Sequence, residues 1–203
     1  MTERRKGVAA AMSTGRLRAI EGGLDPEVER LRAAAAGDER AVRELYRAHV
    51  ERVHRTVARI LGPLDADVED VTQRVFLAAL EGAAGFDGRS RVSTWVVGIA
   101  TRKALDAARA RARRGRWSKL TELVGIGRPA ARPDARHDAL DEAAALLALL
   151  DADQRAVFVL KEVEGYTLKE ISEMTGAGIS TLHARLVAAR KRIDASLGAG
   201  GGR

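Results

Sequence analysis

The chain has 203 residues, a length that suits one or two domains, and a formal net charge of +7, which favours an anionic partner such as nucleic acid. It has no cysteine, which excludes disulfides and thiolate metal sites, and no apolar run near the roughly 20 residues of a membrane span. Aromatic residues make up only 3%, so the core must rely on Leu, Val, Ile and Ala, a composition that favours helix over strand.

The first elements read as a tail followed by helices. Residues 1–23 show no sustained hydrophobic period, and we expect a flexible tail without a signal peptide. Asp25 before Pro26 is typical of a helix start, and this short helix should end at Gly37. A longer helix should begin at Asp38, with an apolar stripe formed by Val42, Leu45, Tyr46, His49, Val53, Val57, Ile60 and Leu61.

A third helix should start at Asp65 or Asp67 and end at Gly82. Its predicted stripe is Val68, Val71, Val75, Phe76, Ala79 and Leu80. Acidic residues in its first turn would interact favourably with the helix dipole. With the next helix, these segments offer enough apolar surface for a compact helical bundle.

The segment 86–116 changes character along its length. A polar loop over 87–91 precedes a helix over 93–114, whose first part carries the apolar stripe Val92, Trp95, Val96, Ile99 and Ala100. Between Arg102 and Lys119 there are eight Lys or Arg and a single acid, Asp106. Arg102, Arg109 and Arg113 share one helical face, which suits a helix lying along a polyanion, although a solvated charged face gives the same pattern.

Glycines and prolines interrupt residues 115–137, and we expect a flexible linker there. Helical pattern returns over 138–150, and Asp151 or Asp153 should cap the next helix, which ends at Gly165. Its predicted stripe is Ala156, Val157, Leu160 and Val163. Residues 198–203 should be a frayed tail.

The strongest pattern covers 166–193, where two short helices flank a tight turn, Gly176-Ala177-Gly178. Predicted core positions are Leu168, Ile171, Met174, Ile179, Leu182, Leu186 and Ile193. These lengths predict a helix-turn-helix, whose second helix docks in the DNA major groove, although an ordinary helical hairpin is the alternative. From 179 to 193 there are four Lys or Arg and no acid. The residues expected to contact base edges and nearby phosphates are Ile179, Ser180, Thr181, His183, Ala184 and Arg185. Arg190 would contact the DNA backbone, polymerase or only solvent.

Together these motifs resemble the extracytoplasmic-function (ECF) sigma factors of bacterial RNA polymerase, which keep only regions 2 and 4. DADVEDVTQRVFLAAL resembles the family's acidic Asp-x-x-Gln-x-Val-Phe helix, and FDGRSRVSTWVVGIATRKALD its loop and Thr-Trp helix. EGYTLKEISEMTGAGISTLHARLVAARKRI resembles its helix-turn-helix. The resemblance implies an all-α protein of two small helical domains: a tail (1–23), a region 2-like domain (24–114), a linker (115–137), a region 4-like domain (138–197) and a tail (198–203).

The resemblance also implies roles for residues. The non-template strand of the melted −10 element would contact Phe86, Asp87, Arg89, Ser90, Arg91, Ser93, Trp95, Arg102, Arg109 and Arg113, with Trp95 either packed or stacked on a base. The helix from 179 would read the −35 duplex. Polymerase would contact Asp67, Asp70, Gln73, Arg74 and Phe76. Arg74 stands where the family often has Glu, and Arg102 where it usually has Asn.

The expected partners are core RNA polymerase and promoter DNA, in the cytoplasm, and the resemblance leaves open an anti-sigma factor that holds the protein at the membrane. No cofactor, metal site or catalytic residue is expected, because the four histidines have no metal spacing and no Ser/His/Asp set is evident. The main rival is a stand-alone helix-turn-helix regulator with an N-terminal effector or dimerisation domain, which would bind duplex operator without polymerase.

Overall fold

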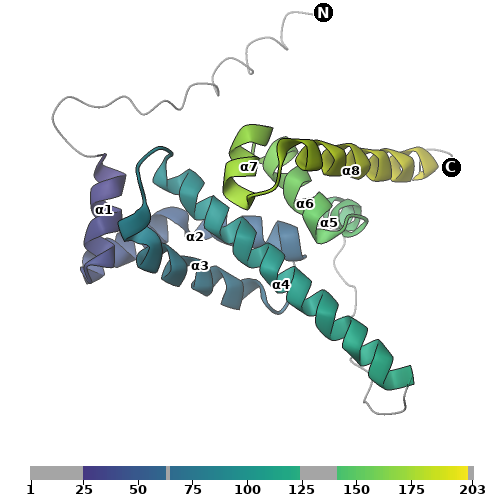
Figure 1. The fold of residues 1–203 in the computed structure, drawn as a ribbon, viewed down its shortest axis with the longest axis horizontal. Coiled ribbons are helices and arrows are strands. Elements are labelled where there is room, and N and C mark those ends of the chain that lie inside the picture. The colour runs from purple at the N-terminus through teal and green to yellow at the C-terminus, as the bar shows by residue number, and fades with distance from the viewer. Residues whose placement is uncertain (1–24, 63–64, 124–140, 201–203) are drawn as a thin grey trace, which may run out of the picture.

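A computed structural model describes residues 25–62, 65–123 and 141–200, which form helices joined by short loops with no strand among them (Figure 1). The N-terminal bundle comprises α1 (Pro26–Ala35), α2 (Glu39–Leu61), α3 (Val68–Gly82) with a 3-10 turn (Ala83–Gly85), and α4 (Val92–Leu123). The C-terminal unit comprises α5 (Asp141–Ala148), α6 (Ala152–Phe158) with a π-helical turn (Val159–Val163), α7 (Leu168–Thr175) and α8 (Ile179–Gly200). The predicted all-α class is therefore confirmed for this part of the chain.

Polar caps set the starts of the first helices, as their sequences predict. The Asp25 carboxylate accepts from the Glu27 N–H at 2.9 Å, and the Asp38 carboxylate accepts from the N–H groups of Arg40 and Ala41. At the start of α3, Asp67 occupies the N-cap position without a capping hydrogen bond from its side chain, and the Asp65 carboxylate accepts from the Asp67 N–H at 2.9 Å. The predicted tail over 1–23 and the linker residues 124–137 lie outside the described residues.

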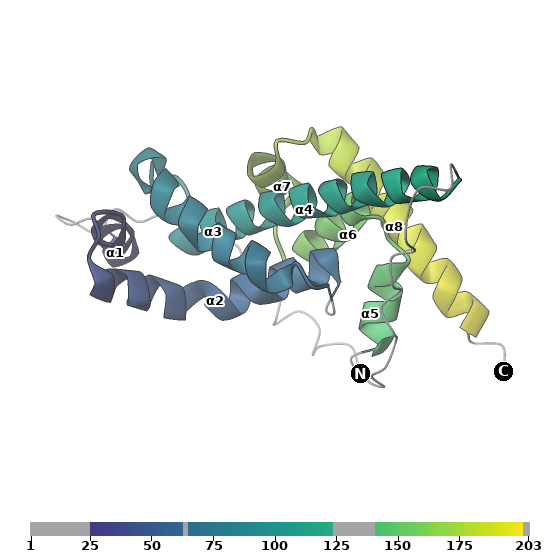
Figure 2. The ribbon, with the colours of Figure 1, turned by 90° about the horizontal axis from the view of Figure 1, so that it is seen from below.

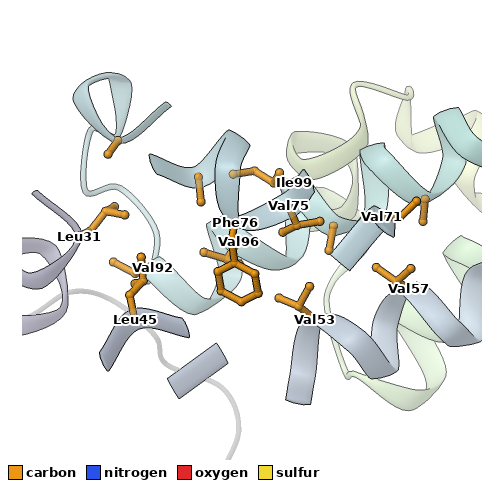
Figure 3. Packing of buried hydrophobic residues seen from close by; sticks show 14 of the residues in the cluster. Leu31, Leu45, Val53, Val57, Val71, Val75, Phe76, Val92, Val96 and Ile99 are labelled. Carbon is orange, nitrogen blue, oxygen red and sulfur yellow. The ribbon is translucent and has the colours of Figure 1, made fainter. Parts of the chain in front are cut away.

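The core of the N-terminal bundle is aliphatic and is formed by all four helices (Figure 3). Figure 3 shows Leu31 of α1 near Leu45 of α2, with Val75 of α3 and Val96 of α4 farther along the same core. Burying such side chains stabilises a fold by roughly 1.5–3 kcal/mol each. The prediction that Tyr46 belongs to the apolar stripe of α2 is wrong, because Tyr46 is 43% exposed.

Two predicted helix ends are wrong. α4 continues through Gly115 to Leu123 instead of ending at Arg114. α8 continues to Gly200 instead of ending at Leu197. A single glycine costs a helix only about 1 kcal/mol relative to alanine, which Arg, Ala, Lys and Leu around it can offset.

The π-helical turn after α6 moves the register of the buried stripe. The N–H of Glu164 donates to the carbonyl of Val159 at 2.9 Å, an i to i+5 bond that makes a wider turn than the α-helix. As a result Val159 is fully buried, whereas Val163, a predicted core residue, is 49% exposed.

The two parts of the chain pack on each other along α4. In Figure 1 and Figure 2 the C-terminal unit lies beside α4, and α4 contacts both α6 and α7. Residues 96–101 of α4 are all buried, including Val97, which belongs to the core cluster of the C-terminal unit. α4 is thus an element shared by both parts.

Candidate nucleic-acid interface

The loop before α4 is anchored from beneath by an aromatic pair. Phe86, a predicted DNA contact, is only 6% exposed, and its ring lies 5.1 Å from that of Trp95. A Cβ at Gly82 would lie 3.4 Å from the Trp95 ring, so Trp95 packs closely over the end of α3. The ring of Phe86 therefore supports the loop, while half-buried Trp95 retains an exposed part.

The top of this loop is polar and tightly turned. Gly88 has a φ of +72°, in the left-handed region that glycine adopts without a side-chain clash. The Asp87 carboxylate accepts from the backbone N–H of Arg89 at 3.0 Å and pairs with its guanidinium at 2.5 Å. These two hydrogen bonds, the backbone bond first, lower the pKa of Asp87. The aliphatic stem and guanidinium of Arg89 extend into solvent.

A cavity of about 230 Å³ opens beside the loop. It brings together four predicted −10 contacts, Arg89, Ser90, Trp95 and Arg102, with three residues of α7 that the sequence did not place there. These three residues are Glu170, Glu173 and Met174. The cavity has basic side chains on one wall and acidic side chains on the other, a charge arrangement that opposes the approach of a polyanion.

The basic end of α4 makes contacts on two sides. Arg102 donates to the carbonyl of Met174 at 2.7 Å. Arg109 lies 3.1 Å from Asp153 and 3.6 Å from Asp106, while exposed Arg113 completes the predicted face.

On its other side, α4 is held against the start of α3 by two ion pairs that the sequence did not reveal. Arg111 pairs with the buried carboxylate of Asp65, and Arg114 lies 3.6 Å from Asp67. Part of the acidic cluster predicted to face polymerase is thus already paired within the chain.

The helix-turn-helix is formed by α7, a short turn and α8. A capping box starts α7, in which Thr167 accepts from the Glu170 N–H and Glu170 accepts from the Thr167 N–H. Gly176 ends α7 with a φ of +74°. The Ser172 hydroxyl donates to the carbonyl of Ala177 at 2.8 Å, which fixes the turn between the helices.

The first turns of α8 present most of the predicted reading residues to solvent. The core beneath them contains Leu182 and Leu186. Ile179 is 51% exposed, so its predicted place in the core is wrong. The exposed predicted contacts are Ile179, Ser180, Thr181, His183, Ala184 and Arg190.

Two arginines of α8 are paired within the C-terminal unit. Arg185 is half-buried and lies 3.4 Å from the Asp153 oxygen that Arg109 also contacts. Arg190 pairs with Glu162 at 2.5 Å. Among the predicted −35 contacts, Arg185 is therefore the one that is paired with Asp153, the carboxylate that also contacts Arg109 of α4.

The outer face of α3 differs from the prediction in one residue. Phe76 is 8% exposed and its ring lies 4.7 Å from Tyr46, so it faces the bundle. Leu77 is 59% exposed and shares a face with Arg74, Gln73 and Asp70, which precede it by three, four and seven residues. That spacing was the available signal for Leu77. Arg74 pairs with Asp70 at 2.6 Å.

Polar contacts between α2 and the C-terminal unit were also missed by sequence reasoning. Glu164 is paired with Arg59 at 3.0 Å and Arg52 at 3.2 Å, and Arg52 donates to the Tyr166 hydroxyl at 3.0 Å. Burial raises the pKa of that hydroxyl. Arg155 donates to the carbonyl of Ile60 at 3.0 Å.

Within the described ranges no group of three or more His, Cys, Asp or Glu side chains could hold a metal ion. The same part of the chain contains no helix long and apolar enough to cross a membrane.

Comparison with known proteins identifies the same two segments. The family described as Sigma-70 region 2 matches residues 45–114, and Sigma-70, region 4 matches residues 140–193. The chain is 31% identical over 172 residues to the ECF RNA polymerase sigma factor SigM of Mycobacterium tuberculosis, covering 85% of each protein. It is 28% identical over 188 residues to the RNA polymerase sigma factor CnrH of Cupriavidus metallidurans, covering 87% of this chain and 98% of that protein.

Two solved structures share the fold. The structure of CnrH in complex with the cytosolic domain of CnrY has a TM-score of 0.57 and 25% identity, and covers 86% of this chain and 99% of that one. The sigma factor RpoE of Bartonella quintana, solved with the anti-sigma factor NepR, has a TM-score of 0.57 and 23% identity, covering 79% and 98%.

Proposed function

The chain belongs to the ECF sigma factors of RNA polymerase, and from that membership we propose how its surfaces divide the work of promoter recognition. As a sigma factor it directs core polymerase to specific promoters and helps to melt them. The observation that carries this function is the presence of both region 2 and region 4 in one chain. A stand-alone helix-turn-helix regulator is not favoured, since region 2 would have no role in it.

We assign the melted −10 strand to the loop before α4 and to the exposed basic face of α4. Single-strand binding needs a basic groove and surfaces against which unstacked bases can lie. Arg89, Ser90 and the exposed part of Trp95 line one cavity, and Arg102, Arg109 and Arg113 continue the basic face. Asp87, Arg91 and Ser93 stay in the assignment, whereas buried Phe86 supports the loop.

We assign the −35 duplex to the N-terminal half of α8. Its polar side chains point outward at the start of the second helix of a helix-turn-helix, where such motifs contact base edges. Arg185 suits a guanine, because a guanidinium donates two hydrogen bonds to its O6 and N7. Arg190 lies farther along the helix and suits a phosphate.

We assign the polymerase contact to the outer face of α3, formed by Asp70, Gln73, Arg74 and Leu77 (the α3 face). Protein–protein contacts commonly have an apolar centre and a polar rim, and exposed Leu77 with the polar side chains around it fits that arrangement. Asp67 lies at the start of this helix and completes the charged part of the surface.

We assign no catalytic residue and no cofactor to the chain, because a sigma factor positions polymerase and the polymerase makes RNA. We expect it to act in the cytoplasm, where its partners are core polymerase and promoter DNA. Since the related CnrH and RpoE structures were solved with CnrY and with the anti-sigma factor NepR, we extend the expectation of an anti-sigma partner to this chain.

A gel-shift experiment tests the proposal against the regulator alternative. Labelled promoter fragments from the source genome are mixed with the chain alone, with core polymerase alone and with both. We expect a sequence-selective complex only when both are present. A selective shift by the chain alone, equal to that of the mixture, would support the regulator instead.

A further inference from the structure

The basic run at the end of α4 faces two directions. Arg102, Arg109 and Arg113 share the face that we assign to the melted strand. Arg111 follows Arg102 by nine residues, about two and a half turns of an α-helix, and therefore lies on the opposite face of α4. There it meets the start of α3 and not the loop before α4. A place along the DNA backbone, as the sequence suggests for the whole run, does not explain this position.

Two ion pairs join this face of α4 to the start of α3, and they differ in burial. The Asp65 side chain is only 5% exposed, and its carboxylate pairs with Arg111. Arg114 and Asp67 are both exposed and lie 3.6 Å apart. An exposed ion pair contributes little to stability, whereas removing one partner of a buried pair is strongly destabilising. The Arg111–Asp65 pair is thus the one that holds α4 against the start of α3.

Asp65 in turn determines how α3 begins. Its N–H donates to the carbonyl of Gly62 at 3.1 Å, and its own carbonyl accepts from the Val68 N–H at 3.1 Å. Its carboxylate accepts from the Asp67 N–H at 2.9 Å. The Asp67 side chain makes no capping hydrogen bond and stays available to a partner. Asp65 therefore connects the end of α2 to the first turn of α3, where the acidic residues assigned to polymerase begin.

Loss of the Arg111 guanidinium would leave the Asp65 carboxylate charged and buried without its cation. Such a group either moves towards water or takes up a proton, because an isolated buried charge is very costly. A move of Asp65 would break its hydrogen bond to the Asp67 N–H and shift the first turn of α3. The position of Asp67 and Asp70 then depends on an arginine that lies outside the surface they form.

We propose that Arg111 is a positioning residue for polymerase binding: it fixes Asp65, and through Asp65 it orients the start of α3. The proposal rests on the proposed polymerase contact of α3 and adds to it a residue from the basic run of α4. Two other roles are open to an arginine at this place, a contact with a DNA phosphate and a direct contact with polymerase. The experiments below separate all three.

The first measurement is the affinity of the full chain for core polymerase, by competition with the fluorescently labelled parent chain. Arg111→Ala should lower this affinity by about tenfold or more, the factor expected if fewer than one molecule in ten keeps the parent arrangement of the start of α3. The matched control is Arg114→Ala, which removes the same charge from the same helix but breaks only the exposed pair, and it should show no such loss. Unchanged affinity of Arg111→Ala would overturn the proposal.

A second substitution separates positioning from direct contact with polymerase. Asp65→Asn keeps an oxygen that can accept from the Asp67 N–H but removes the charge that needs Arg111. The double variant Asp65→Asn/Arg111→Ala should therefore bind core polymerase nearly as well as the parent chain. Because this double variant has no unpaired buried charge, it also provides the test if Arg111→Ala alone does not fold. Weak binding by a double variant that is folded by circular dichroism would mean that Arg111 touches polymerase itself, and would overturn positioning.

The salt dependence of open-complex formation separates positioning from a contact with DNA. It is measured for the parent chain and for Arg111→Ala, or for the double variant, with core polymerase saturated by the chain. An arginine that neutralises one phosphate of a single strand contributes about 0.7 to the slope against log salt. We expect equal slopes, and a smaller slope for the variant would place Arg111 on the DNA and overturn the proposal. Failure of the parent chain to bind core polymerase would instead refute the proposed function, so the two failures are distinguishable.

Discussion

Arg155 should contribute strongly to the stability of the fold. Its guanidinium donates to the carbonyls of Leu147 at 2.8 Å, Leu150 at 3.0 Å and Ile60 at 3.0 Å, and so joins the end of α5 to the end of α2. Ile60 lies in the last turn of α2, where carbonyls lack a partner within their own helix and need one from elsewhere. Burial lowers the pKa of Arg155, in keeping with a charge that has exchanged water for these carbonyls.

The expected cost of Arg155→Ala follows from those three hydrogen bonds. Each hydrogen bond to a charged group contributes about 1.5–3 kcal/mol net, so three independent bonds would give about 4.5–9 kcal/mol. Arg155 is only half-buried, and water can reach part of the vacated space. We therefore expect a loss of about 2–4 kcal/mol in the free energy of unfolding, within the range of strongly destabilising single substitutions. Arg155→Lys keeps the charge but not the planar fork, and should recover at most about one of the three bonds.

Urea unfolding followed by far-UV circular dichroism measures this loss. The matched control is Arg43→Ala, which removes an exposed pair with Glu39 one helical turn away and should cost about 0.5 kcal/mol or less. If Arg155→Ala costs no more than Arg43→Ala, the guanidinium does not hold the two parts together and the reasoning fails.

Three further predictions concern DNA and pH. Arg185→Ala should remove about 1–3 kcal/mol of −35 discrimination, seen as altered promoter choice in transcription assays; unchanged choice would remove Arg185 from base reading. Reversing Arg109 and Arg113 to Glu should weaken open-complex formation and reduce the slope against log salt by about 1.4, or 0.7 for each phosphate that is no longer neutralised; an unchanged slope would remove both from the DNA path. Burial lowers the pKa of His49 below its usual 6.5, so stability should be full above about pH 6.5 and fall below it, as the unfolded chain takes up the proton. His49→Gln should flatten that part of the pH profile of urea midpoints, and equal profiles would contradict the assignment.

Local sequence patterns were sufficient to predict the structure where a helix start or a turn depends only on neighbouring residues. Asp25 and Asp38 each cap a helix through groups two or three residues away, and Gly176 supplies the left-handed end of α7. The same holds for the outward positions of Ser180, Thr181 and His183 in α8, which follow from the spacing of the buried Leu182, although Ile179 was wrongly predicted to lie in the core. Such features follow from short-range hydrogen bonds and helical period, which the sequence displays directly.

The contacts between the two parts could not be predicted in this way, because they join residues far apart in the chain. Glu164 and Arg52 are 112 residues apart, and nothing local marks either as a partner of the other. One signal was present: the run of small and apolar residues from Val96 to Thr101 covers all sides of α4, and a helix that is apolar all round is buried all round. The π-helical turn left no comparable signal, and it moved Val163 out of the core.

The most direct measurement of the central claim is transcription by the purified chain and core polymerase on genomic DNA, with the 5′ ends of the transcripts mapped. The account predicts a small set of start sites that share sequence elements near −10 and −35 and that disappear when either protein is omitted. It is contradicted if the chain does not bind core polymerase, or if adding the chain leaves the start sites of the core enzyme unchanged.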